Sequence, residues 1–228
     1  MMPKTKVNQS DRLRAETDGR RRRGLKARAN VLNRAIDVAS KNGLEGLTIG
    51  GLATDLDIGK GNITVLFGDK ESLQLRTLDA AMDIFDSNVV RPAMTERSPL
   101  KRLQKLCNLW FDSVEQRLFA GGCMLSAASN EYRARPGLVQ DRIVHHRDGW
   151  HTLFANTIRA AIEEGELDGD VDVQQLVFEL IAFQLAANTA SLLGDRRFFL
   201  IARRTAQARI SRARATSKSP SSQRPRRK

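Results

Sequence analysis

The sequence has little cysteine and no long hydrophobic run, and both shortages narrow the classes of protein that it can encode. Two cysteines among 228 residues, Cys107 and Cys123, are too few for a disulfide framework or a four-cysteine zinc site. The N-terminal segment has no apolar core of the kind that a secretory signal needs. The most apolar stretch, Leu176–Leu193, has 18 residues and carries Glu179, Gln184 and Asn188, so we expect a buried helix rather than a membrane span. We therefore expect a cytoplasmic protein with no membrane partner.

Acidic residues are absent from the last 26 positions, and the charge along the chain is uneven as a result. The net formal charge is +12, with +7 in residues 1–29, +10 in residues 203–228 and −5 between them. Basic ends on a mildly acidic body predict a polyanionic partner, usually nucleic acid, and hence an association with the nucleoid. For the C-terminal segment, a solvated tail that only aids solubility is the alternative.

Strand patterns and internal repeats are also missing, whereas apolar residues recur at helical spacing along most of the chain. From Leu25 onward, apolar residues step by three and four, as in an amphipathic helix. Asn42-Gly43 is a typical stop for the first of these helices. The pattern predicts an all-α protein with helices at about 25–42, 48–56, 60–66, 69–89, 100–118, 124–132, 139–164 and 173–193, and a last one after Asp195.

Two short helices separated by Asp57-Ile58-Gly59 predict a helix-turn-helix. Thr48 can cap the first helix through its hydroxyl, and Gly59 stands at the N-cap of the second. Ala53 is small where the two helices must approach closely. The second helix would enter a major groove of DNA with its N-terminal end leading. The apolar contacts between the two helices would come from Leu52, Leu56, Ile58 and Ile63.

This region resembles the tetracycline-repressor (TetR) family of bacterial transcription regulators. The resemblance rests on "RANVLNRAIDVASKNGLEGLTIGGLATDLDIGKGNITVLFGDKESL" and covers residues 28–75. It implies an N-terminal three-helix helix-turn-helix DNA-binding domain and a C-terminal helical ligand-binding and dimerisation domain. The expected boundaries are a disordered basic arm at 1–24, the DNA-binding domain at 25–70, the ligand and dimer domain at 71–202, and the end of the last helix with a disordered basic tail at 203–228.

The resemblance also implies partners: double-stranded DNA, a second copy of the chain and a small, largely apolar effector. Asn62 could pair with adenine, and Thr64 or Val65 could pack on thymine methyl groups. Thr64 stands where the family usually has an aromatic residue, so basic residues before the first helix are expected to compensate through phosphates or a minor groove. Lys70 resembles a family phosphate contact. The expected DNA-binding residues are Thr48, Lys60, Gly61, Asn62, Thr64, Val65, Lys70, Arg22, Arg23, Lys26 and Arg28.

Further residues are expected at the effector cavity and at the dimer interface that the resemblance implies. For the aromatic residues of the cavity set, plain core packing is an equal alternative, and for Cys123 a redox-sensing thiol is another. The expected cavity residues are Trp110, Phe111, Val114, Cys123, Trp150 and Phe154. The expected interface residues, on the last two helices, are Leu185, Asn188, Leu192, Phe198 and Ile201.

Neither a metal site, a cofactor nor a catalytic constellation is expected. The three histidines, His145, His146 and His151, are one, five and six residues apart, which does not fit the i, i+4 spacing of a two-histidine helical metal site. An enzyme built on a helical bundle would need convergent polar groups, which we do not find. The main alternative is a sequence-nonspecific nucleic-acid packaging protein, which would explain both basic ends without needing a helix-turn-helix or an apolar dimer helix.

Overall fold

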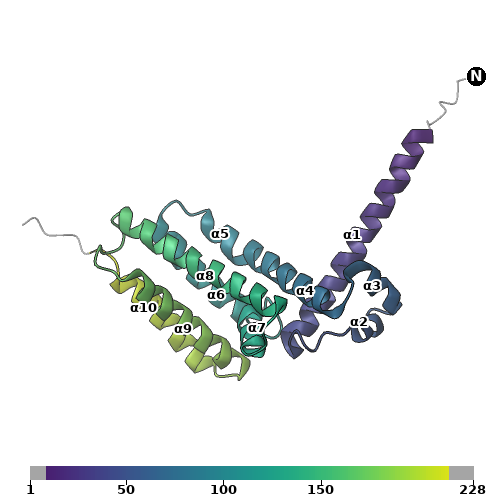
Figure 1. Cartoon of the computed structure of the whole chain (residues 1–228). Helices are drawn as coiled ribbons and strands as arrows, with labels where there is room; N and C mark the ends of the chain where they lie inside the picture. The colour runs from purple at the N-terminus through teal and green to yellow at the C-terminus, as the bar shows by residue number, and fades with distance from the viewer. Residues whose placement is uncertain (1–8, 216–228) are drawn as a thin grey trace, which may run out of the picture.

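The computed structural model describes residues 9–215 and is helical throughout, which confirms the predicted all-α class (Figure 1). For residues 9–21 and Arg23 it describes the backbone alone. The elements are α1 (Gln9–Asn42), α2 (Ile49–Asp55), α3 (Lys60–Phe67), α4 (Lys70–Phe85), the π-helical turn η1 (Asp86–Val90), α5 (Arg91–Met94), α6 (Pro99–Glu115), α7 (Met124–Tyr132), α8 (Leu138–Glu163), α9 (Val173–Leu192) and α10 (Arg196–Arg212). No helix in this part of the chain is both long and apolar enough to cross a membrane.

The first helix is longer than predicted. We expected disorder up to residue 24, but α1 begins at Gln9 and projects well beyond the body of the molecule (Figure 1). The prediction was wrong for residues 9–24 because it required an apolar stripe. This segment is rich in arginine and other strong helix formers, and extending an existing helix avoids the cost of a new nucleus. Residues 1–8 and 216–228, the rest of the predicted disorder, lie outside the described residues.

One hydrophobic core joins the predicted helix-turn-helix to the rest of the protein. Leu52 of α2 and Ile63 of α3 are buried together with residues of α1, as the predicted helix-turn-helix requires. The same core continues through α4, α7 and the start of α8, and includes Met124 and Val139. Because these helices share one core, a displacement of α4 or α7 would act directly on α2 and α3.

The fourth helix does not stop before Pro92, as the sequence pattern had suggested. It passes through η1 and continues to Met94. Proline lacks an amide hydrogen and collides with the carbonyl four residues before it, so a wider π turn lets the helix continue. This turn places Asp86 and Val90 on the wall of the cavity described below.

The C-terminal helices form a second core around α6. Phe111 of α6 is fully buried and packs edge-on against Phe199 of α10 at 5.8 Å between ring centroids. The helices α9 and α10 lie side by side as an antiparallel pair on the side of the body away from α4 (Figure 1). The pair therefore forms an outer layer, and α6 and α8 lie between it and α4.

Candidate DNA-binding helix and ligand cavity

The helix-turn-helix is built by local capping and a tight turn. Thr48 Oγ1 accepts a hydrogen bond from the amide of Gly51 at 2.9 Å and so caps α2. Asp57 adopts a φ of 51° in the turn, and Gly59 precedes α3 with no side-chain cap. Thr48 therefore has a structural role at the start of α2, and its exposed position also leaves it accessible.

The outer face of α3 carries the residues predicted to read DNA. Val65 is 87% exposed, although it is apolar. Thr64 Oγ1 donates to the carbonyl of Lys60 at 3.2 Å, which leaves its methyl group as the outward contact. Lys60, Gly61 and Asn62 are exposed as well. The structure thus brings all five predicted α3 residues onto one short, solvent-facing helix.

The predicted basic contacts divide into exposed side chains and side chains that are engaged within the chain. Arg22 and Lys26 are exposed on α1, and the side chain of Arg23 lies outside the described residues. Arg28 instead donates to the carbonyl of Leu66, and its guanidinium lies over the Phe67 ring at 5.2 Å. The Arg28 side chain therefore holds the end of α3 to α1 in the DNA-free chain, and its contact with phosphate stays a prediction.

Lys70 is also engaged within the chain. Its Nζ lies 2.9 Å from Glu45 Oε2 and 3.0 Å from the Glu45 carbonyl oxygen. Tyr132 donates to the same carboxylate at 2.5 Å, and these bonds, that from Tyr132 first, lower the pKa of Glu45 to about 2. Lys70 therefore holds the turn between α1 and α2 in the DNA-free chain, and its contact with phosphate stays a prediction.

A second carboxylate holds the same turn from α7. Glu131 accepts hydrogen bonds from the amides of Leu44 and Glu45, at 2.8 and 2.9 Å. Gly43, with a φ of +79°, ends α1 so that these two amides point outward. The sequence pattern gave no signal for this contact, because the partners are 87 and 86 residues apart.

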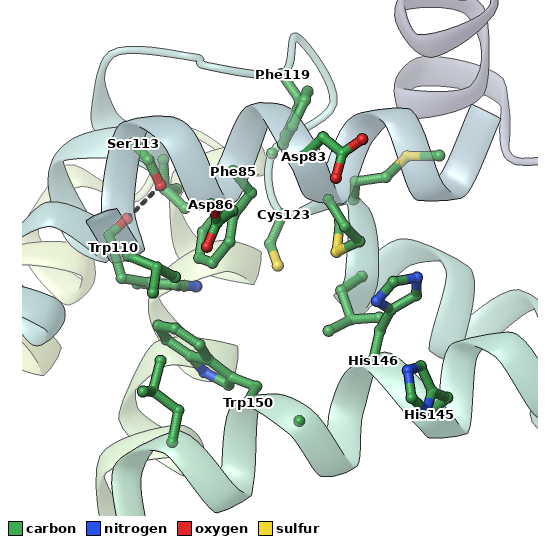
Figure 2. Close-up of a pocket in the computed structure, with 18 residues that line it drawn as sticks. Asp83, Phe85, Asp86, Trp110, Ser113, Phe119, Cys123, His145, His146 and Trp150 are labelled. Carbon is green, nitrogen blue, oxygen red and sulfur yellow. Dashed lines mark hydrogen bonds between the residues drawn. The ribbon is translucent and has the colours of Figure 1, made fainter. Parts of the chain in front are cut away.

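A cavity of about 460 Å³ lies between α4, α6, α7 and α8. Figure 2 shows Trp110 and Trp150 at one end, His145 and His146 at the other, and the Cys123 sulfur pointing into the space between them. Its size and its mostly apolar and aromatic wall are typical of a small-molecule site. Further wall residues are Met82, Asp83, Phe85, Asp86, Val90, Ser113, Val114, Phe119, Gly122, Met124, Leu125, Gly149 and Leu153.

Four of the six predicted ligand residues line this cavity, namely Trp110, Val114, Cys123 and Trp150. Phe111 and Phe154 do not, since both are fully buried in the core behind it. The ring of Phe154 packs against Trp150 at 4.8 Å and so supports the wall without forming it. The sequence analysis missed Phe85 and the two aspartates of the wall, because helical spacing alone does not show which apolar face is left uncovered.

The polar groups at the histidine end are braced between α4 and α8. His146 Nε2 lies 3.0 Å from Asp79 Oδ1, and Arg142 donates to the other oxygen of that carboxylate. Burial alone would raise the pKa of Asp79, but these two partners bring it below its ordinary value. The pair is a fixed structural contact, and among the described residues no cluster of histidine, cysteine or acidic groups could hold a metal ion.

The thiol chemistry of the cavity disfavours a redox sensor. Burial raises the pKa of the Cys123 thiol, and burial raises that of Cys107 to about 12. Because the thiolate is the reactive form, both cysteines are poor nucleophiles at neutral pH. Cys123 is therefore better explained as a wall residue of the cavity.

The predicted interface residues of α9 and α10 are exposed, with one exception. Leu185, Leu192, Phe198 and Ile201 are exposed apolar side chains. Asn188 is buried and accepts a hydrogen bond from the amide of Cys123 at 2.8 Å, so its assignment to the interface was wrong. The same surface also has Phe178 and Leu193, 73% and 80% exposed, which the helical pattern did not single out.

The chain is similar to a known protein family over part of its length and to solved structures over most of it. Residues 99–206 match the family model of the tetracyclin repressor-like C-terminal domain. A TetR transcriptional regulator from Chloroflexus aurantiacus J-10-FL is 20% identical, with 86% of this chain and 100% of that chain covered, at a TM-score of 0.79. A TetR-family regulator from Cytophaga hutchinsonii is 18% identical, with 86% and 98% covered, at 0.75.

A third similar structure contains DNA. A cysteine mutant of the TetR-family regulator CifR, in complex with 26-bp double-strand operator DNA, is 21% identical, with 78% of this chain and 94% of that chain covered, at a TM-score of 0.66. No curated protein matches the sequence.

Proposed function

Because the chain belongs to the TetR family of transcriptional regulators, we propose that it binds a partly palindromic operator as a homodimer and leaves it when a small, largely apolar effector binds. The observation that carries this proposal is the exposed α3 face on a helix-turn-helix whose core continues to a 460 Å³ cavity. The protein would act in the cytoplasm by binding, without catalysis, and as a repressor.

Sequence readout by α3 would rest on few side chains. Asn62 is the one residue there that can make a bidentate contact with adenine, and Val65 offers an apolar contact for a thymine methyl group. Exposed Arg22 and Lys26 on α1 would contact phosphates and fix the register. The operator complex of CifR supports this use of the fold.

Replacing Asn62 by alanine is expected to weaken specific binding by about 1–3 kcal/mol, the value of a good bidentate base contact. Affinity should be measured by fluorescence anisotropy on promoter DNA from the flanking genes and on a scrambled duplex. Asn156→Ala, at an exposed asparagine of α8, is the matched control and should change neither value. Equal losses on both duplexes for Asn62→Ala would assign Asn62 to the backbone and would favour the nonspecific packaging function.

The homodimer would form through the outer face of α9 and α10. Isolated apolar side chains are normal on a surface, but seven large exposed ones on α9, α10 and the turn between them would be covered by a partner. Pairing with a second copy would give a four-helix bundle and would place the two α3 helices on the same side of the dimer. Half-sites about one helical turn of DNA apart would then match the two-fold axis.

The Phe178→Glu substitution is expected to convert the dimer to monomer at micromolar concentration in sedimentation velocity. Phe178 is 73% exposed in the single chain, so a carboxylate there costs the monomer little but would be desolvated in the bundle. The control is Val144→Glu, at a 47% exposed apolar residue of α8. A Phe178→Glu protein that remains a dimer would place the interface elsewhere.

Helix α7 offers a direct route from effector to DNA-binding domain. Its first turn, Met124 and Leu125, lines the cavity, and Glu131 near its end holds the turn between α1 and α2. A ligand that moved the first turn would move this contact, and with it α2 and α3. The shift in operator affinity is limited by the difference between the effector's affinities for the two conformers.

A further inference from the structure

A second, smaller chamber of about 250 Å³ adjoins the cavity on the side of α9. The two chambers share four wall residues, Trp110, Cys123, Leu125 and Trp150. The second chamber adds Ser126, Ser129, Asn130, Arg133, Arg147, His151, Ile181, Gln184 and Leu185. The wall residues that only the second chamber has are therefore more polar than those at the aromatic end of the first chamber.

Gln184 is the buried polar group of this second wall. Its side chain is only 2% exposed, and its Oε1 accepts a hydrogen bond from Trp150 Nε1 at 3.1 Å. An indole nitrogen can only donate, so this bond fixes which way the amide is turned. The Nε2 donor is then left without a hydrogen-bond partner among the described residues. Buried donors are rarely left unpaired, because the group loses water without gaining an acceptor.

The charges of the two chambers differ in sign. The carboxylates of Asp83 and Asp86 belong to the first chamber, whereas the second has Arg133 and Arg147 and no acidic residue. Burial is the main cause that lowers the pKa of His151, with the nearby Arg147 contributing, which favours the neutral imidazole. The wall of the second chamber thus offers an oxygen acceptor two arginines and the Gln184 amide, whose covered Nε2 it would reach after a small movement of that side chain, and it offers an ammonium group no carboxylate.

We propose that the second chamber holds an oxygen acceptor of the effector, a carbonyl or carboxylate, which accepts from Gln184 Nε2 while the apolar part of the effector packs between Trp110 and Trp150. The inference rests on the proposed function, because it identifies the ligand of this cavity with the effector. It excludes effectors whose only polar group is a cation.

Three probes with one skeleton test the proposal on the full-length protein: 4-phenylbutanamide, 4-phenylbutanoate and 4-phenylbutylamine, the last protonated at pH 7. Affinities are measured by isothermal titration calorimetry, with thermal shift as a second readout. The amide and the carboxylate are expected to bind at least about tenfold more tightly than the amine. Gln184→Met, which keeps the side-chain length but removes the donor, should weaken the amide about tenfold, the value of one hydrogen bond.

Gln175→Met is the matched control, because Gln175 lies on the same helix, is exposed and donates to Glu179 outside the chambers. It should leave all three affinities unchanged. The melting temperature of each ligand-free variant shows whether the variant folds. If Gln184→Met does not fold, Gln184→Glu takes its place. The glutamate keeps an acceptor for Trp150 and should repel the carboxylate probe.

Equal or tighter binding of the amine would overturn the proposal in favour of a cationic effector held by Asp83 and Asp86. The proposal is also wrong if no probe binds, or if the Gln184 variants bind the amide probe as tightly as the unsubstituted protein does. Binding of the ligand-free protein to promoter DNA is measured separately. Failure there contradicts the proposed regulator, whereas failure of the probes alone contradicts only this assignment of the chamber.

Discussion

Replacing Gly121 by alanine is expected to lower the free energy of unfolding by about 3 kcal/mol or more, the largest effect that we expect from adding one methyl group. A Cβ at this position would overlap the carbonyl oxygen of Ser40, near the end of α1, and would also crowd the Lys41 amide. These neighbours are backbone atoms of a helix, so no side chain can move aside. The hydrogen bond from the Gly121 amide to Ser40 Oγ would be lost as well.

The measurement is urea unfolding followed by circular dichroism, with Gly169→Ala as the control, since nothing lies within 4 Å of a Cβ built on Gly169. Operator affinity is measured in parallel, because the 119–123 loop contacts the cavity, α1 and α9. Phe119, Gly122 and Cys123 line the cavity, Gly121 abuts α1, and the Cys123 amide is held by Asn188 of α9. A Gly121→Ala protein as stable as the control would mean that α1 yields easily, and α1 would then not be held rigidly by this loop.

Helix positions and the helix-turn-helix followed from the sequence because they depend on residues close together in the chain. Thr48 caps α2 through an amide only three residues away, and Leu52 and Ile63 are buried by the crossing of two adjacent helices. The failure at residues 9–24 is of the same local kind. Helix propensity alone continued α1, and the pattern analysis had looked only for an apolar face.

The functional side chains were harder to predict because their roles depend on distant partners. Trp150 and Phe154 are one helical turn apart on α8, yet Trp150 faces the cavity and Phe154 packs behind it. Lys70 is an exposed cation by type, but Glu45 engages it from 25 positions away. Asn188 lies on the most apolar helix, but its oxygen holds an amide 65 residues away. Spacing gives the face of a helix and does not give the element that covers it.

The two basic ends offer a matched comparison of charge with position. Removing residues 1–24 and removing residues 215–228 each eliminates a net formal charge of +5. If charge alone governed operator affinity, the two truncations would weaken binding equally. The structure places the two segments differently: α1 extends past α2 and α3, whereas α10 ends at Arg212 on the opposite side of the molecule (Figure 1).

Removing residues 1–24 is expected to weaken operator binding by about 10- to 1,000-fold and to lower the slope of log affinity against log salt by several units, since each phosphate contact contributes about 0.9. A helix is about 10–12 Å across and the minor groove about 6 Å wide, so a helical arm would contact phosphates along the backbone rather than enter the groove. The loss should therefore be nearly independent of operator sequence.

Removing residues 215–228 should leave the slope of log affinity against log salt almost unchanged. Anisotropy titrations across a salt series on the full chain and both truncations give the three slopes. If the C-terminal truncation lowers the slope as much as the N-terminal one does, the tail also contacts DNA, contrary to the geometry of a single chain.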